Sequence, residues 1–230
     1  MNNDINMNRL WAALLLAGLG LSGEASAALI DRGGGMIYDS DLNITWLRDA
    51  SYAQTSGYFT DSRITWYDAT TWAANLVYGG YDDWRLPKTL QPDPTCDHQY
   101  DAGAPYGTQS DGFNCAGSEL GHLFYNELGG TAGQSILNSA DPDLGLFINI
   151  QSYAYWSDTE FAVNTSRTWR FFASDGNQNT WFKASQGGVA WAVRTGDVAA
   201  AVPEPASLAL LGAGLAGLMG VRRRRGWPVL

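Results

Sequence analysis

Three side chains at alternate positions, Asp39, Asp41 and Asn43, have the spacing with which calcium-binding loops begin. In such a loop, oxygens at positions 1, 3 and 5 surround the ion, a glycine at position 6 allows a sharp turn, and a glutamate at position 12 completes the coordination. Ile44 and Ala50 stand at those last two positions here. Two interpretations stay open, which are a calcium site and a plain hairpin turn.

The two cysteines, Cys96 and Cys115, lie in a segment, 91–117, that is rich in Pro, Gly, Asp, Thr and Ser. In an oxidising compartment they are expected to form a disulfide, which would close a loop of about 20 residues and stabilise the fold by roughly 3 kcal/mol. The alternative is a redox or metal pair that includes His98, although this spacing is a poor metal signature. Four aspartates of the segment could also gather a cation: Asp93, Asp97, Asp101 and Asp111.

The two histidines, His98 and His122, have no Ser, Cys or carboxylate at a spacing typical of catalysis. His122 is expected on a helix surface or beside a hydrogen-bonding partner. Glu119 and Glu127 are eight residues apart on the same predicted helix, which is more typical of a solvent face than of an acid/base pair. We therefore expect no catalytic residue and a protein that is not an enzyme.

The charge balance is acidic, with 20 Asp and Glu against 9 Lys and Arg between residues 28 and 201. Nucleic acid is an unsuitable partner for this region, because phosphate binding requires a basic face. An acidic surface suits solubility, cation binding or contact with neutral sugars. Arg85 and Arg194 are expected to form ion pairs inside the fold, with Asp82, Asp83 or Asp158 as partners.

Tryptophan is frequent, and eight of the ten lie in the region 28–201. Exposed aromatic rings stack on sugar faces, whereas buried tryptophans build the core of a loop-rich fold. We expect core positions for Trp46, Trp84, Trp156 and Trp191, and exposure of either Trp66 or Trp72, which fall on different helix faces. Contact with a ligand is expected on loops held by a scaffold and on the late strands, at Tyr100, Tyr106, Phe113, Trp169 and Trp181.

The region around these residues predicts an α+β fold with two helices and an antiparallel sheet. The first helix, 64–77, begins with Thr65 as N-cap and Asp68 three residues later, and the second, 118–128, begins at Ser118. Aromatic and β-branched runs predict short strands, at 30–38, 43–47, 147–150, 154–157, 168–173, 180–184 and 189–194.

The N-terminus has the features of a signal peptide, 1–27, with an apolar stretch from Leu10 to Leu21. An A-x-A cleavage site at Ala25 and Ala27 places the mature start at Ala28. An uncleaved N-terminal anchor is the alternative, although the apolar stretch is short for a membrane span.

The C-terminus combines a short rigid motif, an apolar run and a cationic stop. The motif is Val202, Pro203, Glu204 and Pro205; the uncharged run is 206–221; and the stop is Arg222, Arg223, Arg224 and Arg225. Residues 198–201 form a linker and residues 226–230 a tail. The run predicts a transmembrane helix with the arginines on the cytoplasmic side, and a buried core helix is the alternative.

This arrangement resembles the PEP-CTERM sorting signal of Gram-negative bacteria. The resemblance implies that an exosortase recognises residues 202–205 and that the apolar helix is a transient membrane anchor. It also implies an association with exopolysaccharide production and biofilm, since the sorting system tends to accompany it. The tail after the arginines departs from the usual pattern.

Several short motifs in order resemble the Lcl C-terminal domain family, over most of residues 35–196. They lie at 81–87, 118–120, 155–160, 171–176 and 192–194, and the opening hairpin matches at 38–48. The resemblance implies one domain, 28–197, into which this chain inserts the cysteine segment 91–117. The same motifs are more distantly similar to the C-type-lectin-like fold of formylglycine-generating enzymes, which implies a compact domain whose two ends lie close together. Those enzymes use a cysteine pair near the end of the domain, and this chain has no cysteine after Cys115.

Together these features predict an exported protein of the cell envelope or extracellular matrix. Its precursor is expected in the inner membrane, and its domain is expected to bind extracellular polysaccharide or another surface component without catalysis. No cofactor is expected apart from the calcium interpretation. Two alternatives stay open, an enzyme acting on polysaccharide and a structural matrix component without a ligand.

Overall fold

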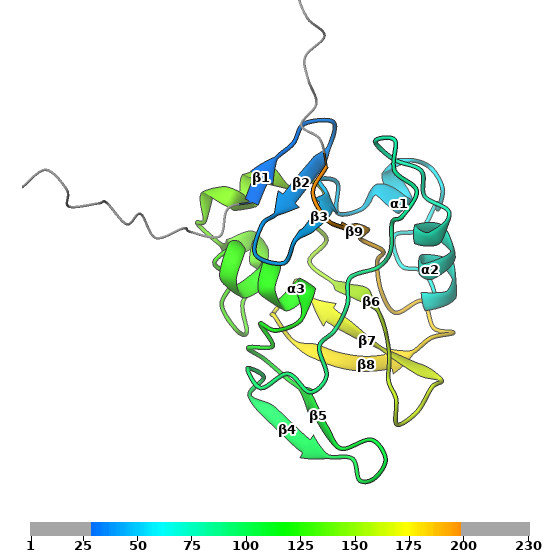
Figure 1. Cartoon of the computed structure of the whole chain (residues 1–230), viewed down its shortest axis with the longest axis vertical. Coiled ribbons are helices and arrows are strands. Elements are labelled where there is room, and N and C mark those ends of the chain that lie inside the picture. Colours follow the sequence, from blue (N-terminus) through cyan, green and yellow to red (C-terminus); the bar gives the residue numbers. More distant parts are fainter. Residues whose placement is uncertain (1–28, 199–230) are drawn as a thin grey trace, which may run out of the picture.

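A computed structural model describes residues 29–198 as a mixed α+β domain with three antiparallel sheets (Figure 1). The predicted signal peptide with Ala25, Ala27 and Ala28, and the sorting signal with residues 202–205, 206–221 and 222–225, lie outside the described residues. Within the described residues, no helix is both long and apolar enough to span a membrane.

The first sheet joins the beginning of the domain to its end. It has the order β1 (Leu29–Asp31), β2 (Met36–Asp39), β3 (Ile44–Leu47) and β9 (Val193–Thr195), all antiparallel. Glycines at 33–35 have positive φ and turn the chain between β1 and β2, so the single strand predicted at 30–38 is two strands. The predicted strand at 189–194 was too long, because only its last part pairs with β3.

The third sheet has the order β6 (Ala154–Glu160), β7 (Arg167–Phe172) and β8 (Gln178–Phe182), as the aromatic runs predicted. The expected strand at 147–150 is wrong, since Ile148 makes only an isolated bridge to Asp49. The late strands therefore do not form one sheet: β9 leaves them and pairs with β3 at the start of the domain.

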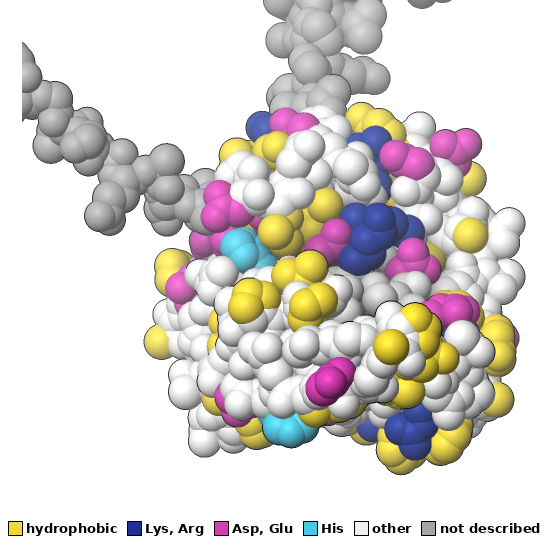
Figure 2. Space-filling view, turned by 60° about the horizontal axis from the view of Figure 1, so that its bottom comes forward, with side chains coloured by type: hydrophobic (Ala, Val, Ile, Leu, Met, Phe, Trp, Pro, Cys, Tyr) yellow, Lys and Arg dark blue, Asp and Glu magenta, His cyan; other side chains and the backbone are white. Residues whose placement is uncertain are grey.

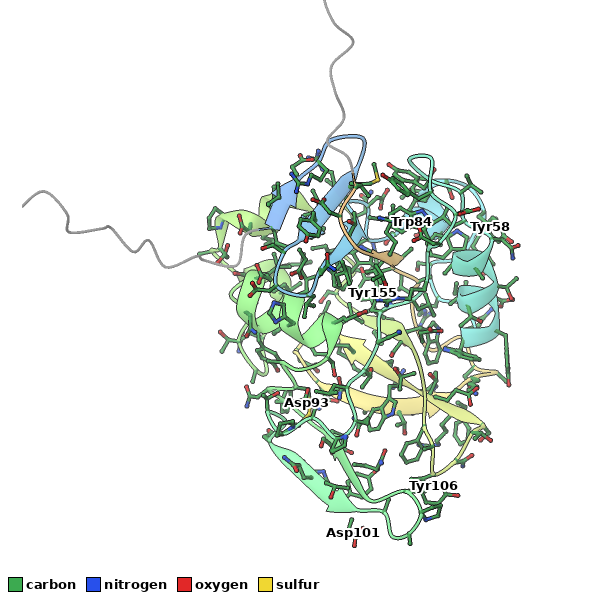
Figure 3. The ribbon with its side chains drawn as sticks, viewed as in Figure 1. Tyr58, Trp84, Asp93, Asp101, Tyr106 and Tyr155 are labelled. Carbon is green, nitrogen blue, oxygen red and sulfur yellow. A yellow bond between two sulfur atoms is a disulfide. The ribbon has the colours of Figure 1, made fainter. Side chains whose placement is uncertain are left out.

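The segment 91–117 is more regular than its composition suggested. It forms a two-stranded hairpin of β4 (His98–Asp101) and β5 (Thr108–Asp111), which projects from the lower end of the domain (Figure 1). The predicted disulfide between Cys96 and Cys115 is present at the base of the hairpin. At the far tip lies Tyr106 (Figure 3).

The helices are short. A single turn, α1 (Tyr52–Thr55), precedes α2 (Trp66–Ala74), and the Thr65 hydroxyl accepts from the Asp68 amide as predicted for an N-cap. The second predicted helix, 118–128, is α3 (Glu119–His122) continued by a π-helical turn, η2 (Leu123–Glu127). Two 3₁₀ turns, η3 (Ile136–Asn138) and η4 (Pro142–Leu146), lead to β6.

Tryptophans build the core, as expected for Trp46, Trp84, Trp156 and Trp191, which are all buried. The ring of Trp191 lies 5.2 Å from that of Trp46 and 5.3 Å from that of Tyr155, between centroids. Its indole Nε1 donates to the Leu47 carbonyl at 2.7 Å. Tyr155 lies in the middle of the molecule (Figure 3). This cluster joins the first sheet to the third, so the two sheets share one core.

Candidate functional site

Two of the motifs that resemble the Lcl C-terminal domain, 81–87 and 118–120, meet in an ion-paired cluster at the start of α3. Arg85 makes a two-pronged pair with Glu119, with Nη1–Oε2 and Nη2–Oε1 both at 2.7 Å. Glu119 also accepts from the Lys88 amide at 2.7 Å. The expected acidic partners of Arg85 were therefore wrong, as was the solvent-facing position of Glu119. The arrangement closes the fold rather than presenting a free charge to a ligand.

The second predicted ion pair is confirmed. Arg194 donates from Nε to Oδ1 of Asp83 at 2.7 Å and from Nη2 to Oδ2 at 3.0 Å, and its guanidinium lies over the Tyr81 ring. Hydrogen bonding to Arg194 lowers the pKa of the Asp83 carboxyl below its ordinary 3.8, against the opposing effect of burial. Asp158 forms no ion pair with either arginine but lies near enough to the Arg85–Glu119 pair to interact with it, and burial raises the pKa of its carboxyl despite the nearby Arg85.

The carboxylates and the cysteines of the segment 91–117 make contacts within the segment itself. Because both cysteines are in the disulfide, no thiolate remains for the metal or redox pair with His98. The ring of His98 instead contacts Asp111 across the hairpin and stacks on Tyr100 at 5.7 Å. The other three carboxylates accept hydrogen bonds from backbone amides of the same segment. Asp93 accepts from the amides of Thr95 and Gly117. Asp97 accepts from the Phe113 amide, and Asp101 accepts from the Gly103 amide.

The predicted ligand contacts differ in exposure. Trp181 and Tyr106 are exposed, whereas Tyr100 and Phe113 are partly buried. Trp169 is buried, with its ring edge-on to Phe161 at 5.5 Å, and so is not available to a ligand. Figure 2 shows that exposed hydrophobic side chains on the face turned forward form several small groups with acidic side chains between them. On this face the exposed apolar side chains form no single large patch, so local aromatic positions are the candidates for ligand contact.

The clearest aromatic surface lies on β8, an edge strand of the third sheet. Trp181 is 39% exposed and Phe182 is 45% exposed. Each ring is backed by an arginine from β7: the guanidinium of Arg170 lies 4.4 Å from the Trp181 centroid, and that of Arg167 lies 4.3 Å from the Phe182 centroid. Cation–π contact holds the rings in place while leaving one side open to solvent. We call these four residues the β8 platform.

A hydrogen bond from Arg170 to the backbone fixes the position of the β8 platform. Arg170 is buried, and its Nη1 donates to the Gly187 carbonyl at 2.8 Å. A Cβ at Gly187 would lie 2.5 Å from Cδ1 of the Trp181 ring, so the glycine allows the indole to approach the backbone closely. Sequence reasoning found Trp181 but missed Phe182 and both arginines, because cross-strand register decides which arginine lies over which ring.

A second aromatic surface is a groove between α1 and α2. It is lined by Tyr52, Tyr58, Trp72 and Val77 among others. Tyr58 is exposed at the edge of the domain (Figure 3), whereas Trp72 is buried in its floor. Of the two tryptophans on this helix, Trp66 is therefore the more exposed. The polar residues that line the groove include Ser56 and Asn75.

The motif Asp39, Asp41 and Asn43, whose spacing resembles the start of a calcium-binding loop, forms a hairpin turn. One of its three side chains points into the protein. Asn43 adopts a positive φ of 51° in the turn between β2 and β3, and its Oδ1 accepts from the Tyr38 hydroxyl at 3.0 Å. Asp41 is exposed. Asp39 points inward and is 1% exposed. The hairpin-turn interpretation is thus confirmed, and the three side chains do not share the roles of a calcium loop.

Asp39 meets two other buried ionisable side chains, His122 and Glu127, and we call this group the Asp–His–Glu cluster. One ligand-capable atom from each lies within 4.8 Å of the other two. His122 Nε2 lies 3.0 Å from Glu127 Oε1 and 4.0 Å from Asp41 Oδ2. Burial and then the Asp39 carboxylate raise the pKa of Glu127 above its ordinary 4.5. Sequence reasoning placed His122 correctly beside a partner but put Glu127 on the solvent face, which is wrong.

Two family models match the chain. The first, described as Lcl C-terminal domain, matches residues 35–194, and the second, described as PEP-CTERM protein-sorting motif, matches residues 201–225. The two matches do not overlap, and the first includes the hairpin segment and all residues of both candidate sites. No curated protein and no solved structure matches the chain.

Proposed function

The chain belongs to the Lcl C-terminal domain family and carries an exosortase sorting motif, and on this premise we propose that it is a non-catalytic glycan-binding protein of the cell envelope or extracellular matrix. The sorting motif implies export and processing by an exosortase. The domain then acts outside the cytoplasm, where extracellular polysaccharide is the abundant partner. In the same proposal, the domain has a lectin-like architecture, with binding residues on the edges of a compact scaffold.

The observation that carries this proposal is the β8 platform. A sugar ring presents C–H groups on one face and hydroxyls around its rim. The exposed ring of Trp181 suits the C–H groups, and the Phe182 ring lies 6.2 Å away between centroids at 65° to it. The side chains beside them supply hydrogen bonds to hydroxyls. Arg167 donates from Nη1 to the Thr180 hydroxyl at 3.2 Å, so its guanidinium is already oriented at the platform. Preorganised aromatic residues lose little entropy on binding.

The test is binding of the exported full chain, purified in detergent, to a glycan array and to matrix polysaccharide. We expect Trp181→Ala to reduce binding at least about tenfold, which corresponds to loss of one aromatic anchor. Tyr58→Ala is the control, since it removes a still more exposed ring from the other aromatic surface. Equal loss in Tyr58→Ala would move the site to the groove, and no binding by the unchanged protein would overturn the proposal.

A further inference from the structure

The Asp–His–Glu cluster places ionisable side chains in the protein interior, where folded proteins ordinarily avoid charge. Asp39, His122 and Glu127 are 1%, 9% and 4% exposed, so water does not solvate these groups freely. With a neutral imidazole, two buried carboxylates carry two negative charges at one point. Burying unpaired charge costs several kcal/mol. Among the described residues no Lys or Arg forms an ion pair with these carboxylates, and Arg85 and Arg194 pair with Glu119 and Asp83 instead. A positive charge is the missing component.

A carboxylate oxygen of Asp39 without a hydrogen-bond partner marks the position at which a positive charge would lie. Asp39 Oδ1 accepts from the Leu42 amide at 3.0 Å, whereas Oδ2 is buried and has no hydrogen-bond partner among the described residues. Buried polar atoms are nearly always paired, and a bound water or ion is one explanation for a carboxylate oxygen without a donor. The unpaired oxygen belongs to the residue whose side chain points toward the His122 ring and Glu127.

We propose that Asp39, His122 and Glu127 bind a divalent transition-metal ion of the Zn²⁺ type, with Asp41 as an outer fourth ligand. Two carboxylates and one imidazole are a ligand set that suits Zn²⁺ and similar ions. Ca²⁺ prefers oxygen ligands, whereas the imidazole of His122 offers a nitrogen ligand. A 2+ ion balances the two buried carboxylates.

The ligand distances are compatible with this ion. Ligands at about 2.0–2.2 Å from a zinc ion lie roughly 3–4 Å from one another. The His122–Glu127 and His122–Asp41 separations are 3.0 and 4.0 Å. The three buried ligand atoms, within 4.8 Å of one another, need only a small contraction to enclose the ion. Because Asp41 is exposed, the site has one side open to solvent.

The contact of the second ring nitrogen depends on the orientation of one side-chain amide. As placed, Asn126 Nδ2 lies 2.9 Å from His122 Nδ1 and donates to it, so metal binding through Nε2 requires this amide to be turned over. A metal-binding histidine uses its other nitrogen to donate to an acceptor, which fixes the ring. The amide of Asn126 supplies that acceptor when its oxygen faces the ring, since both ends of an amide occupy the same space. Nε2 is then directed at the ion.

The site joins two parts of the chain that are about eighty residues apart. Asp39 and Asp41 end β2 and form the following turn, whereas His122 and Glu127 belong to α3 and η2. In Figure 1 the turn between β2 and β3 lies beside α3. An ion at this point stabilises the folded state relative to the unfolded chain, because only the folded chain assembles the ligands.

The test uses the exported full chain without a histidine tag, stripped with EDTA, reloaded with Zn²⁺ and dialysed. We expect close to one zinc per chain by mass spectrometry of the metal, and a fall of about tenfold or more in Glu127→Gln and in Asp39→Asn. His98→Gln is the matched control, because it removes the histidine of the exposed pair with Asp111. The control is expected to keep its zinc.

Two further measurements keep the test independent of variant folding. Co²⁺ added to the unchanged protein should give visible absorption typical of nitrogen and oxygen ligation, and Zn²⁺ but not Ca²⁺ should raise its Tm. Absence of both effects, or equal zinc in Glu127→Gln and the unchanged protein, would overturn the proposal. Calcium binding in place of zinc would do so as well. Glycan binding is measured separately, so the two proposals can fail independently.

Discussion

The side chains of His122 and Glu127 meet at 3.0 Å although the residues are five apart in the sequence. On a regular α-helix, with 3.6 residues per turn, residues at this spacing point away from one another. The chain here widens into a π turn, in which the Leu128 amide donates to the Leu123 carbonyl five residues earlier at 3.0 Å. Such turns are frequent at functional sites, and this one completes the Asp–His–Glu cluster.

The first prediction concerns the Arg85–Glu119 pair. Glu119→Ala should lower the free energy of unfolding by about 3 kcal/mol, because it leaves a largely buried guanidinium and the Lys88 amide without their acceptor. Denaturant unfolding measures the change. Asp197→Ala is the control, since the Arg32–Asp197 pair is more exposed and should contribute under about 1 kcal/mol. Equal losses in both variants would contradict the prediction.

The second prediction is a pH dependence at Asp83. Its pKa is lowered in the folded state by Arg194, so the pair contributes stability above the unfolded pKa of about 3.9 and loses it as pH falls through the folded value. The difference in unfolding free energy between the unchanged protein and Asp83→Asn should be constant from about pH 5 to 7 and shrink below about pH 4.

Asp82→Asn is the matched control for the pH experiment, because it changes the neighbouring exposed carboxylate in the same segment. Unfolding curves at several pH values would compare the three proteins. A difference at Asp83 that grows as the pH falls would have the wrong sign and would exclude the ion pair as its source.

The third prediction concerns the disulfide. Its two cysteines are 19 residues apart, and replacing both by serine should lower the free energy of unfolding by about 3 kcal/mol through the entropy of the freed loop. Unfolding of the double variant and of the unchanged protein is compared with and without reductant. The reductant should affect only the unchanged protein. An unaltered stability in the double variant would mean that the hairpin hydrogen bonds alone order this segment.

The fourth prediction concerns Gly121, which lies within α3. A Cβ there would lie 1.8 Å from the backbone oxygen of Cys115, so Gly121→Ala must separate α3 from the disulfide segment. The expected loss is roughly 3 kcal/mol by overpacking. Gly145→Ala is the control, because nothing lies within 4 Å of its added Cβ, and it should change stability by no more than about 0.5 kcal/mol. Similar Tm values for the two variants would show that α3 is loosely held.

Local patterns predicted much of the architecture. The cap at Thr65, the late strands β6, β7 and β8, the disulfide and the core tryptophans are all present as expected. Each of these depends on residues near in sequence or on burial of large apolar rings, which composition reveals. The C-terminal sorting motif is confirmed by its family model.

The sequence by itself determined the positions of α2 and of the strands β6, β7 and β8, the burial of four core tryptophans and the presence of a PEP-CTERM sorting motif, because these depend on local pattern. Only the tertiary structure decided that β9 pairs with β3, that Arg85 binds Glu119, and that Asp39 meets His122 and Glu127. These contacts join residues from about thirty to a hundred and fifty positions apart. Their partners are chosen by packing and by the π turn, and neither leaves a periodic signal in the chain.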